Sequence, residues 1–318
     1  LKTQGVVLQS HLLQERVVTT FGLREDRTYD KSGADALFNY SPNTGITLDY
    51  NSINSQLLAG DYARNEGKTK TAGVVVKPTR WLNLYANKSD SFTPAGYALS
   101  LFLQPLPNPT GEGKDYGFAL NLFEGKLVAR VNRYQTTQFN SRNSSNRTIS
   151  QRLRALDFDS TSASYPQGLT ERATVWIAAA NPTLTLDQLK QRVATFCSLD
   201  IAYLNQAGSV AEQNNAVGAT ADVVAKGTEV ELNYNPSNFW TVKLNVAENE
   251  SMDSRISQDT TDYIAQRTPV WEKIIDPDVG RPWFTERYGG ATSSKEYLEA
   301  NVMAPLNIAK ATEGKSRP

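Results

Sequence analysis

Histidine and cysteine are almost missing from this sequence of 318 residues, which contains one of each, His11 and Cys197. A single cysteine excludes an intramolecular disulfide and a zinc site built from several cysteines. A single histidine excludes every mechanism that needs two. An excess of one charge is also missing, because 33 Lys and Arg balance 33 Asp and Glu. A nucleic-acid partner held by a basic surface is therefore not expected.

Long apolar runs are missing as well. No stretch approaches 18 uninterrupted apolar residues, which excludes a bundle of transmembrane helices. Disorder throughout the chain is excluded by 5 Trp, 14 Tyr and 11 Phe. The sequence opens at Leu1 without an initiator methionine or signal peptide and closes in a polar stub, so we expect an internal piece of a longer polypeptide.

What the sequence does contain is alternation of apolar and polar residues with a period of two. The clearest case is 240–246, where four apolar side chains alternate with Thr241, Lys243 and Asn245. Successive side chains of a strand point to opposite faces, so such runs predict strands with one apolar and one polar face. Eight of them form four hairpins with tight turns, at 5–13 with 17–27, 71–77 with 81–89, 115–122 with 126–138, and 221–234 with 239–248.

The connections between the hairpins are long and carry signals of short helices. Thr185 and Gln188 have capping-box spacing, as do Ser293 and Glu296, and Pro269 interrupts a third helical stretch. Connections of this length are unusual in compact soluble domains. We expect long external loops at 28–70, 90–114, 139–220 and 249–318.

Short turns at one end of alternating strands and long loops at the other are typical of an outer-membrane β-barrel. Backbone groups cannot stay unpaired in hydrocarbon, so the strands must close into a barrel. We predict an all-β fold, an antiparallel meander of about eight strands that forms part of a transmembrane β-barrel. The apolar face would meet outer-membrane lipid, with Arg133 as the main exception. The candidate lumen-facing residues are His11, Arg130, Asn132, Lys243 and Asn245.

Five segments resemble stretches of TonB-dependent outer-membrane receptors, in the same order along the chain. No single segment is specific, and Asp115 stands before Tyr116 where the family often has tyrosine followed by glutamate. The segments are 5–24, 73–92 with its Ser-Phe-Thr-Pro exit, 106–117, 125–134 and 227–240.

The resemblance implies a location in the outer membrane of a Gram-negative-type bacterium. It implies active import of a scarce nutrient, such as an iron chelate carried by a siderophore, cobalamin or a glycan. The energy would come from the TonB complex through a plug and a TonB box, neither of which has a counterpart in this chain. The family barrel has 22 strands, so eight strands form only part of it. Nothing in the residues selects the cargo.

The loops contain aromatic residues that could stack on a ligand such as a sugar, and they are equally suited to packing the loops together. They also support the alternative function, a soluble secreted β protein that binds carbohydrate. Regular charges on the outward face would favour this alternative, because lipid-facing charges are costly. The candidate ligand contacts are Trp176, Tyr203, Trp271, Trp283 and Tyr288.

Candidate catalytic and metal-binding residues are few, and the prediction includes no catalytic residue, cofactor or metal. Glu229 and Glu231 share one strand face at about 7 Å, which suits a glycosidase pair as well as a wet lumen. Two carboxylate pairs, Asp157 with Asp159 and Asp276 with Asp278, suit calcium or solvated loops. Cys197 beside Phe196 is interpreted as a buried structural thiol.

Overall fold

The structure is a computed structural model that describes residues 1–30, 37–41, 45–49, 63–158, 168–206, 216–288 and 292–316. The chain divides into two compact units. We call the first the sheet unit, which comprises Leu1–Ala95, Thr110–Gln135 and Thr228–Glu248. The second is the helical unit, which comprises Gly96–Pro109, Thr136–Gly227 and Asn249–Pro318.

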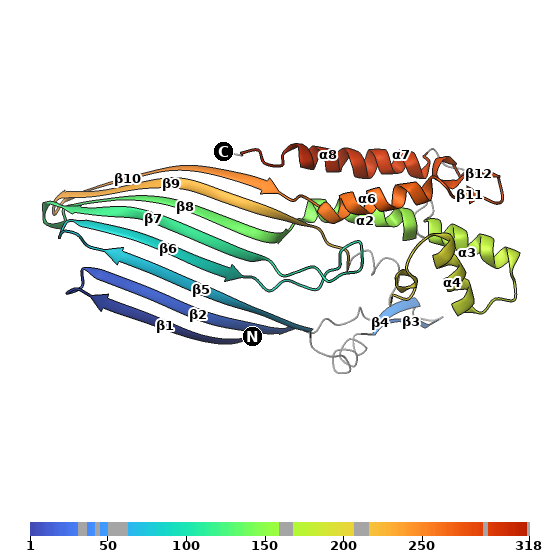
Figure 1. The fold of residues 1–318 in the computed structure, drawn as a ribbon, viewed down its shortest axis with the longest axis horizontal. Helices are drawn as coiled ribbons and strands as arrows, with labels where there is room; N and C mark the ends of the chain where they lie inside the picture. The colour runs from blue at the N-terminus through green and yellow to red at the C-terminus, as the bar shows by residue number, and fades with distance from the viewer. Residues whose placement is uncertain are drawn as a thin grey trace. The chain divides into compact units, whose positions relative to one another are not determined.

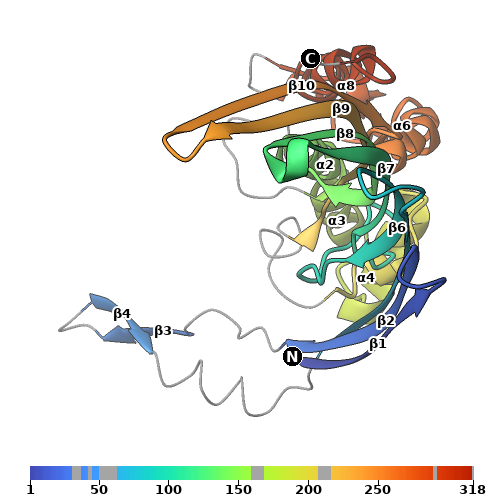
Figure 2. The same ribbon diagram turned by 90° about the vertical axis from the view of Figure 1, so that its left-hand side faces the viewer.

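The main sheet is an open meander of eight strands in the order β1-β2-β5-β6-β7-β8-β9-β10, with β1 and β10 at its edges (Figures 1 and 2). All eight predicted strands are present, and the predicted hairpin partners are neighbours, so the predicted fold class is confirmed. The bounds are β1 Lys2–Leu12, β2 Val17–Asp30, β5 Ala63–Val76, β6 Leu82–Phe92, β7 Thr110–Leu122, β8 Leu127–Arg142, β9 Thr220–Ser237 and β10 Trp240–Ser254.

Several strands continue beyond the predicted ends, and β5 shows why. It begins at Ala63 rather than at residue 71. In 64–70, charged residues alternate with Asn65, Gly67 and Thr69, so both faces are polar or small. A pattern based on apolar alternation cannot detect such a segment, although its register with β2 continues from Val17↔Val76 to Asp30↔Ala63.

Two of the tight turns use left-handed backbone. Leu13, Gln14 and Glu15 have φ of 53°, 54° and 67° between β1 and β2. Between β7 and β8 the turn is η1, Phe123–Gly125, where Gly125 has φ of 89°. Only glycine adopts this region without a steric cost, which accounts for Gly125 in the turn. Two short hairpins were not predicted: β3 (Leu37–Ser41) with β4 (Gly45–Asp49), and β11 (Ile275–Asp276) with β12 (Arg281–Pro282).

The long loops contribute more helix than the sequence indicated. Both predicted capping boxes are present, at Thr185 with Gln188 and at Ser293 with Glu296. Pro269 does not end its helix, which continues to Trp271. The helices are α2 Ser144–Phe158, α3 Leu169–Ala180, α4 Leu186–Phe196, η2 Ile201–Tyr203, α6 Gln258–Trp271, η3 Trp283–Thr285, α7 Ser294–Leu298, η4 Glu299–Met303 and α8 Ala304–Ala311. None of the helices within the described ranges has the length and apolarity to cross a membrane.

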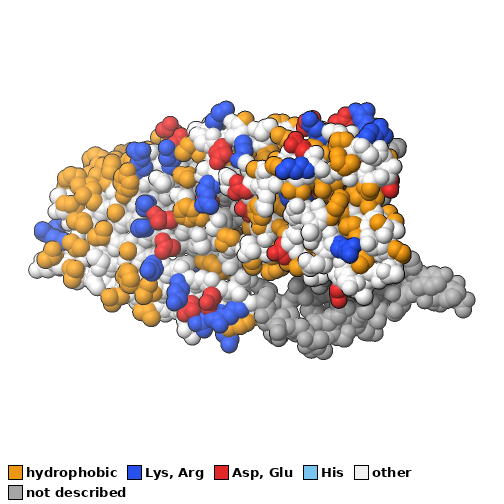
Figure 3. All heavy atoms as spheres, turned by 45° about the vertical axis from the view of Figure 1, so that its right-hand side comes forward, with side chains coloured by type: hydrophobic (Ala, Val, Ile, Leu, Met, Phe, Trp, Pro, Cys, Tyr) orange, Lys and Arg blue, Asp and Glu red, His pale blue; other side chains and the backbone are white. Residues whose placement is uncertain are grey.

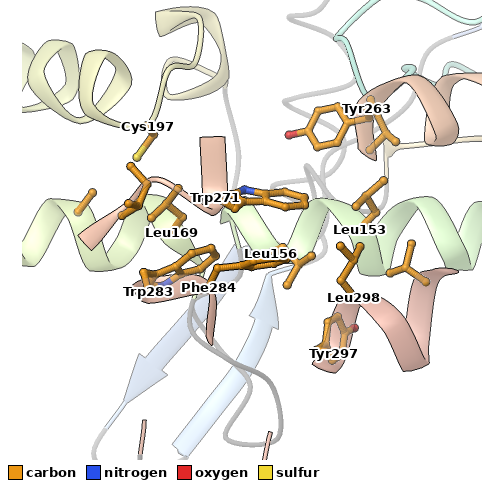
Figure 4. Packing of buried hydrophobic residues seen from close by; sticks show 14 of the residues in the cluster. Leu153, Leu156, Leu169, Cys197, Tyr263, Trp271, Trp283, Phe284, Tyr297 and Leu298 are labelled. Carbon is orange, nitrogen blue, oxygen red and sulfur yellow. The ribbon is translucent and has the colours of Figure 1, made fainter. Parts of the chain in front are cut away.

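These helices enclose a hydrophobic core of their own (Figure 4). Leu153 and Leu156 of α2 belong to one buried cluster with Trp271 of α6, and with Trp283 and Phe284 of η3. The Trp271 and Phe284 rings lie 5.7 Å apart between centroids. Burial of aromatic side chains on this scale stabilises a packed unit. The helical unit is therefore a compact body rather than a set of separate loops.

A buried ion pair joins α2 to α6 inside this core. The Asp157 carboxylate accepts from Arg267 Nη2 at 2.7 Å and Nε at 2.9 Å, from the Tyr263 hydroxyl at 2.8 Å, and from Trp271 Nε1 at 2.9 Å. Arg267 Nη1 donates to the carbonyl oxygen of Cys197 at 2.8 Å. A buried charge is tolerated when it is paired and hydrogen-bonded in this way.

Candidate ligand-binding face of the sheet

The pairing register separates the two faces of the sheet. One row across four strands contains Thr20, Gly73, Asn87 and Asp115, whose side chains are polar or absent. We call their face the polar face. The next row contains Phe21, Ala72, Lys88 and Lys114 on the opposite face. We call this opposite face the apolar face, because most of its residues near the turns are hydrophobic.

A pocket of about 420 Å³ lies on the polar face. It crosses the sheet from β5 to β9, so five strands contribute to one site. Its volume falls within the range of small-molecule sites. The lining residues are Val75, Asn83, Tyr85, Asp115, Ala119, Arg130, Asn132, Glu229 and Glu231.

Tyr85 is positioned by a glycine on the neighbouring strand. Tyr85 is paired with Gly117, and a Cβ atom at Gly117 would lie 2.7 Å from the Tyr85 hydroxyl oxygen and would overlap the Val131 carbonyl oxygen. The ring therefore lies across the space that a side chain would fill. The hydroxyl donates to Asn132 Oδ1 at 3.1 Å and lies 3.4 Å from the Val131 carbonyl oxygen. Tyr85 thus connects β6 to β8 across β7.

The pocket carries more negative than positive charge. Asp115, Glu229 and Glu231 face one cation, Arg130, whose Nη1 lies 3.9 Å from Glu231 Oε2. Asn87 Nδ2 donates to Asp115 Oδ1 at 3.1 Å. Carboxylates accept hydrogen bonds only, so the pocket suits a ligand that presents hydroxyl or ammonium donors. No group of three or more His, Cys, Asp or Glu within the described ranges could hold a metal ion.

The structure brings together part of the predicted lumen-facing set. Arg130 and Asn132 line the pocket. His11 is paired with Val18, which is paired with Val75 of the pocket, so His11 lies on the polar face at the edge strand β1. Lys243 and Asn245 lie on the same face of β10 as Thr241, whose hydroxyl donates to Asn235 Oδ1 at 2.9 Å. Asn235 shares strand parity with Glu231, which places Lys243 and Asn245 on the polar face as well, outside the pocket.

The apolar face exposes large hydrophobic side chains near the turns on several of its strands. The exposed fractions are 62% for Leu8, 47% for Phe21, 55% for Tyr116 and 54% for Leu244. Figure 3 shows hydrophobic side chains gathered toward the turn end and charged side chains in a band beside them. Counted from the turns, the first charged residues on this face are Lys2, Glu25, Lys70, Lys88, Lys114, Arg133, Lys226 and Glu248.

The charge-free part of the apolar face extends over several residues of each strand. It runs from Leu82 to Ala86 in β6 and from Tyr234 to Thr228 in β9. At about 3.3 Å per residue these runs extend roughly 13 to 20 Å along the strand. Arg133, the apparent exception in the sequence, occupies the same boundary as the first charges of the other strands.

The five aromatic candidates lie in the helical unit in two kinds of position. Trp176, Trp271 and Trp283 are buried in the core, with Trp271 and Trp283 at 0% exposure. Tyr203 and Tyr288 are half-buried. The Tyr203 hydroxyl donates to the Leu101 carbonyl at 2.9 Å, and the Tyr288 hydroxyl donates to Asp276 Oδ2 at 2.5 Å. Burial and the Asp276 carboxylate raise the pKa of Tyr288. The role of these five residues in ligand binding stays a prediction.

Two of the carboxylates considered for calcium, those of Asp157 and Asp276, accept hydrogen bonds from protein donors, and Asp278 is exposed. Asp157 holds Arg267, Tyr263 and Trp271, as described above. Asp276 is fully buried, accepting from the Asp278 backbone N–H at 2.8 Å and from Tyr288. Asp159 lies outside the described residues. Cys197 is buried, and burial raises the pKa of its thiol to about 12. A buried thiol that stays protonated is unreactive, which fits the interpretation of Cys197 as a structural thiol.

Sequence reasoning missed Tyr85, Asn83 and Asp115 as pocket residues. Each stands at a polar position of an alternating strand, so the pattern placed them on the polar face without showing which of them converge. The pairing of Tyr85 with Gly117 was the available signal, because a glycine within a strand often marks a close approach.

Among known proteins, this chain is similar to solved structures only. No protein-family model matches the chain, and no curated protein matches it. The alcaligin outer-membrane receptor FauA of Bordetella pertussis is 12% identical with a TM-score of 0.43, over 80% of this chain and 31% of that one. The ferric-catecholate import receptor Fiu of Escherichia coli K12 is 11% identical with a TM-score of 0.40, over 79% and 28%.

A third similar structure is the Pseudomonas aeruginosa receptor FpvA bound to heterologous pyoverdines. It is 12% identical with a TM-score of 0.38, over 79% of this chain and 32% of that one. The chain thus spans about a third of the length of these receptors.

Proposed function

We propose that this chain is part of the barrel of an outer-membrane active transporter that imports a scarce nutrient with energy from TonB. The cargo would be an iron chelate, cobalamin or a glycan. The chain would act by binding and gating, with no covalent step. The TonB complex would act through a plug and a TonB box supplied outside this chain, and the chain would form one part of a longer receptor.

The observation that carries the proposal is the difference between the two faces of one open sheet. The apolar face is hydrophobic, exposed and free of charge near the turns, while the polar face carries a charged pocket. Exposed apolar area of this extent is rarely left in water. Strands with an apolar outer face and a polar inner face are the elements of a membrane barrel with a wet interior.

Within this proposal the polar face lines the path of the cargo. Arg130 and Asn132 would contact the cargo in the pocket, and His11, Lys243 and Asn245 would line the wet lumen nearby. Of the aromatic candidates, Tyr203 and Tyr288 are the ones that solvent reaches. We propose them as contacts at the helical unit, and we place Trp176, Trp271 and Trp283 behind them as packing.

Uptake by cells tests the proposal directly. Cells carrying the full-length protein should accumulate a radiolabelled ferric chelate, cobalamin or oligosaccharide, and dissipating the proton gradient should stop uptake. Arg130→Gln should raise the KM for uptake about tenfold or more, because a charge-assisted hydrogen bond contributes roughly 1.5–3 kcal/mol. Lys126→Gln, at the β7–β8 turn, is the matched control and should leave uptake unchanged.

Uptake of none of these cargo classes above the level of a deletion strain would contradict the transport proposal. Uptake that Arg130→Gln leaves unchanged would contradict the role of the pocket alone.

A further inference from the structure

The apolar face contains a groove of about 570 Å³ that crosses four strands, β2, β5, β6 and β7. Its floor is made of small side chains, Ala72, Val74 and Ala86, in adjacent pairing rows. Phe21 stands on one side and Tyr116 on the other. Larger residues at the floor positions would fill the groove, so its depth comes directly from these alanines.

Two lysines close one end of the groove. Lys88 is paired with Lys114, and Lys88 is also paired with Ala72 of the floor. Both side chains are about half exposed, at 56% and 53%. Across β2, β5, β6 and β7 their row, Phe21, Ala72, Lys88 and Lys114, contains no carboxylate. Glu112 lies one position further on the same face, with Oε2 3.3 Å from Lys88 Nζ and Oε1 2.6 Å from Lys114 Nζ.

The charge at this end stays positive after Glu112 is counted. Lys70 lies on the same face beyond Ala72 and adds a third ammonium group. Asp90 is paired with Glu112 and is the other carboxylate of that row. Three ammonium groups thus face two carboxylates, and both carboxylates lie on the side away from the groove.

We propose that this groove binds one anionic membrane lipid, with an acyl chain along Ala72, Val74 and Ala86 and the headgroup phosphate at Lys88 and Lys114. The inference rests on the proposed function and deepens it, since it assumes that the apolar face meets a bilayer. The apolar floor matches the acyl chain, and the cationic end matches the phosphate. Lys88 and Lys114 are also the first charges after the charge-free run, the level at which headgroups begin.

Lipid selectivity of the full-length protein tests the inference. The protein is purified in a nonionic detergent, stripped of lipid and titrated with dioleoylphosphatidylglycerol or dioleoylphosphatidylcholine, and bound lipid is counted by native mass spectrometry. Each ammonium near a lipid headgroup contributes a factor of about five. With the opposing effect of Glu112, the wild type should prefer the phosphatidylglycerol about tenfold.

Two variants and a matched control separate the parts of the groove. Lys88→Gln with Lys114→Gln should reduce the preference to about twofold or less. Ala86→Phe should weaken binding of both lipids by similar factors, because it fills the floor. Arg80→Gln with Lys126→Gln removes two positive charges at exposed turns and should leave the preference near tenfold.

Several results would overturn the inference. Equal binding of the two lipids by the wild type, or an unchanged preference in the double lysine variant, would contradict the lipid site. Inorganic phosphate that binds alone as tightly as the lipid would identify a soluble anion as the ligand instead. Fractionation of the same protein separates failure of the lipid site from failure of the transporter proposal. A protein that is soluble without detergent contradicts the transporter proposal itself.

Discussion

Replacing Asp157 by asparagine should unfold the helical unit at a much lower denaturant concentration. Asparagine has nearly the same shape as aspartate but carries no charge. Its amide nitrogen, itself a donor, would face the donors from which the carboxylate now accepts hydrogen bonds. Arg267, only 2% exposed, would remain as a buried cation without its anion. Removing one partner of such a pair costs about 3–5 kcal/mol.

That cost is large for a unit of this size. A loss of 1 kcal/mol lowers the melting temperature of a domain of 150–250 residues by about 2–4 °C, so the variant should melt roughly 6–20 °C lower. Tyr263→Phe removes one donor and leaves the pair intact, with an expected cost of about 1–2 kcal/mol. Asp187→Asn makes the same change of charge on an exposed residue of α4 and should cost at most about 1 kcal/mol.

Guanidinium unfolding and thermal unfolding, both followed by tryptophan fluorescence, are the assays, because the Trp271 indole donates to Asp157 and reports the loss of the pair. The protein is kept in one detergent throughout, so that only the substitution differs. If Asp157→Asn loses no more than Asp187→Asn, the buried pair does not hold α2 to α6, and the account of the helical core is wrong.

Four further predictions concern other sites. Gly117→Ala should lower the free energy of unfolding of the sheet by about 3 kcal/mol in denaturant titrations, while Gly96→Ala, which meets nothing within 4 Å, should be close to neutral. Hydrogen bonds from Arg287 and Ser293 lower the pKa of Glu296 to about 2 from its ordinary 4.5. The contribution of Glu296 to the free energy of unfolding is therefore complete above about pH 4.5 and is lost as the pH falls toward 2. Glu296→Gln should flatten this part of the curve of stability against pH, measured by circular dichroism. Cys197 should resist iodoacetamide at pH 8 in the folded protein and react after denaturation, and rapid labelling of the native state would contradict its burial. The open sheet should make the isolated chain aggregate or require detergent, whereas a monodisperse monomer without detergent would contradict the exposed apolar face.

Alternation predicted the sheet well because one face of each strand is consistently apolar. The four hairpins followed from this pattern and from tight turns, which are local features. The two capping boxes were also found, since each depends on residues three positions apart. The polar extension of β5 was missed, because neither of its faces is apolar there and strand pairing alone maintains it.

The helical core and the pocket could not be derived, because they depend on contacts between distant residues. Asp157 and Arg267 are 110 positions apart, and Tyr85 and Asn132 are 47 apart. A single sequence gives no sign of which distant polar residues meet. The loop aromatics illustrate the limit, since stacking on a ligand and packing in a core need the same residues, and only the fold separates buried Trp271 from half-buried Tyr203.

Whether the apolar face meets lipid is decided by fractionation of the full-length protein from its own cells, followed by extraction with and without detergent. We expect recovery in the outer-membrane fraction, with release by detergent and not by salt or alkaline washing. Recovery as a soluble protein without detergent would contradict the assignment of the apolar face to lipid, and with it the proposed transporter.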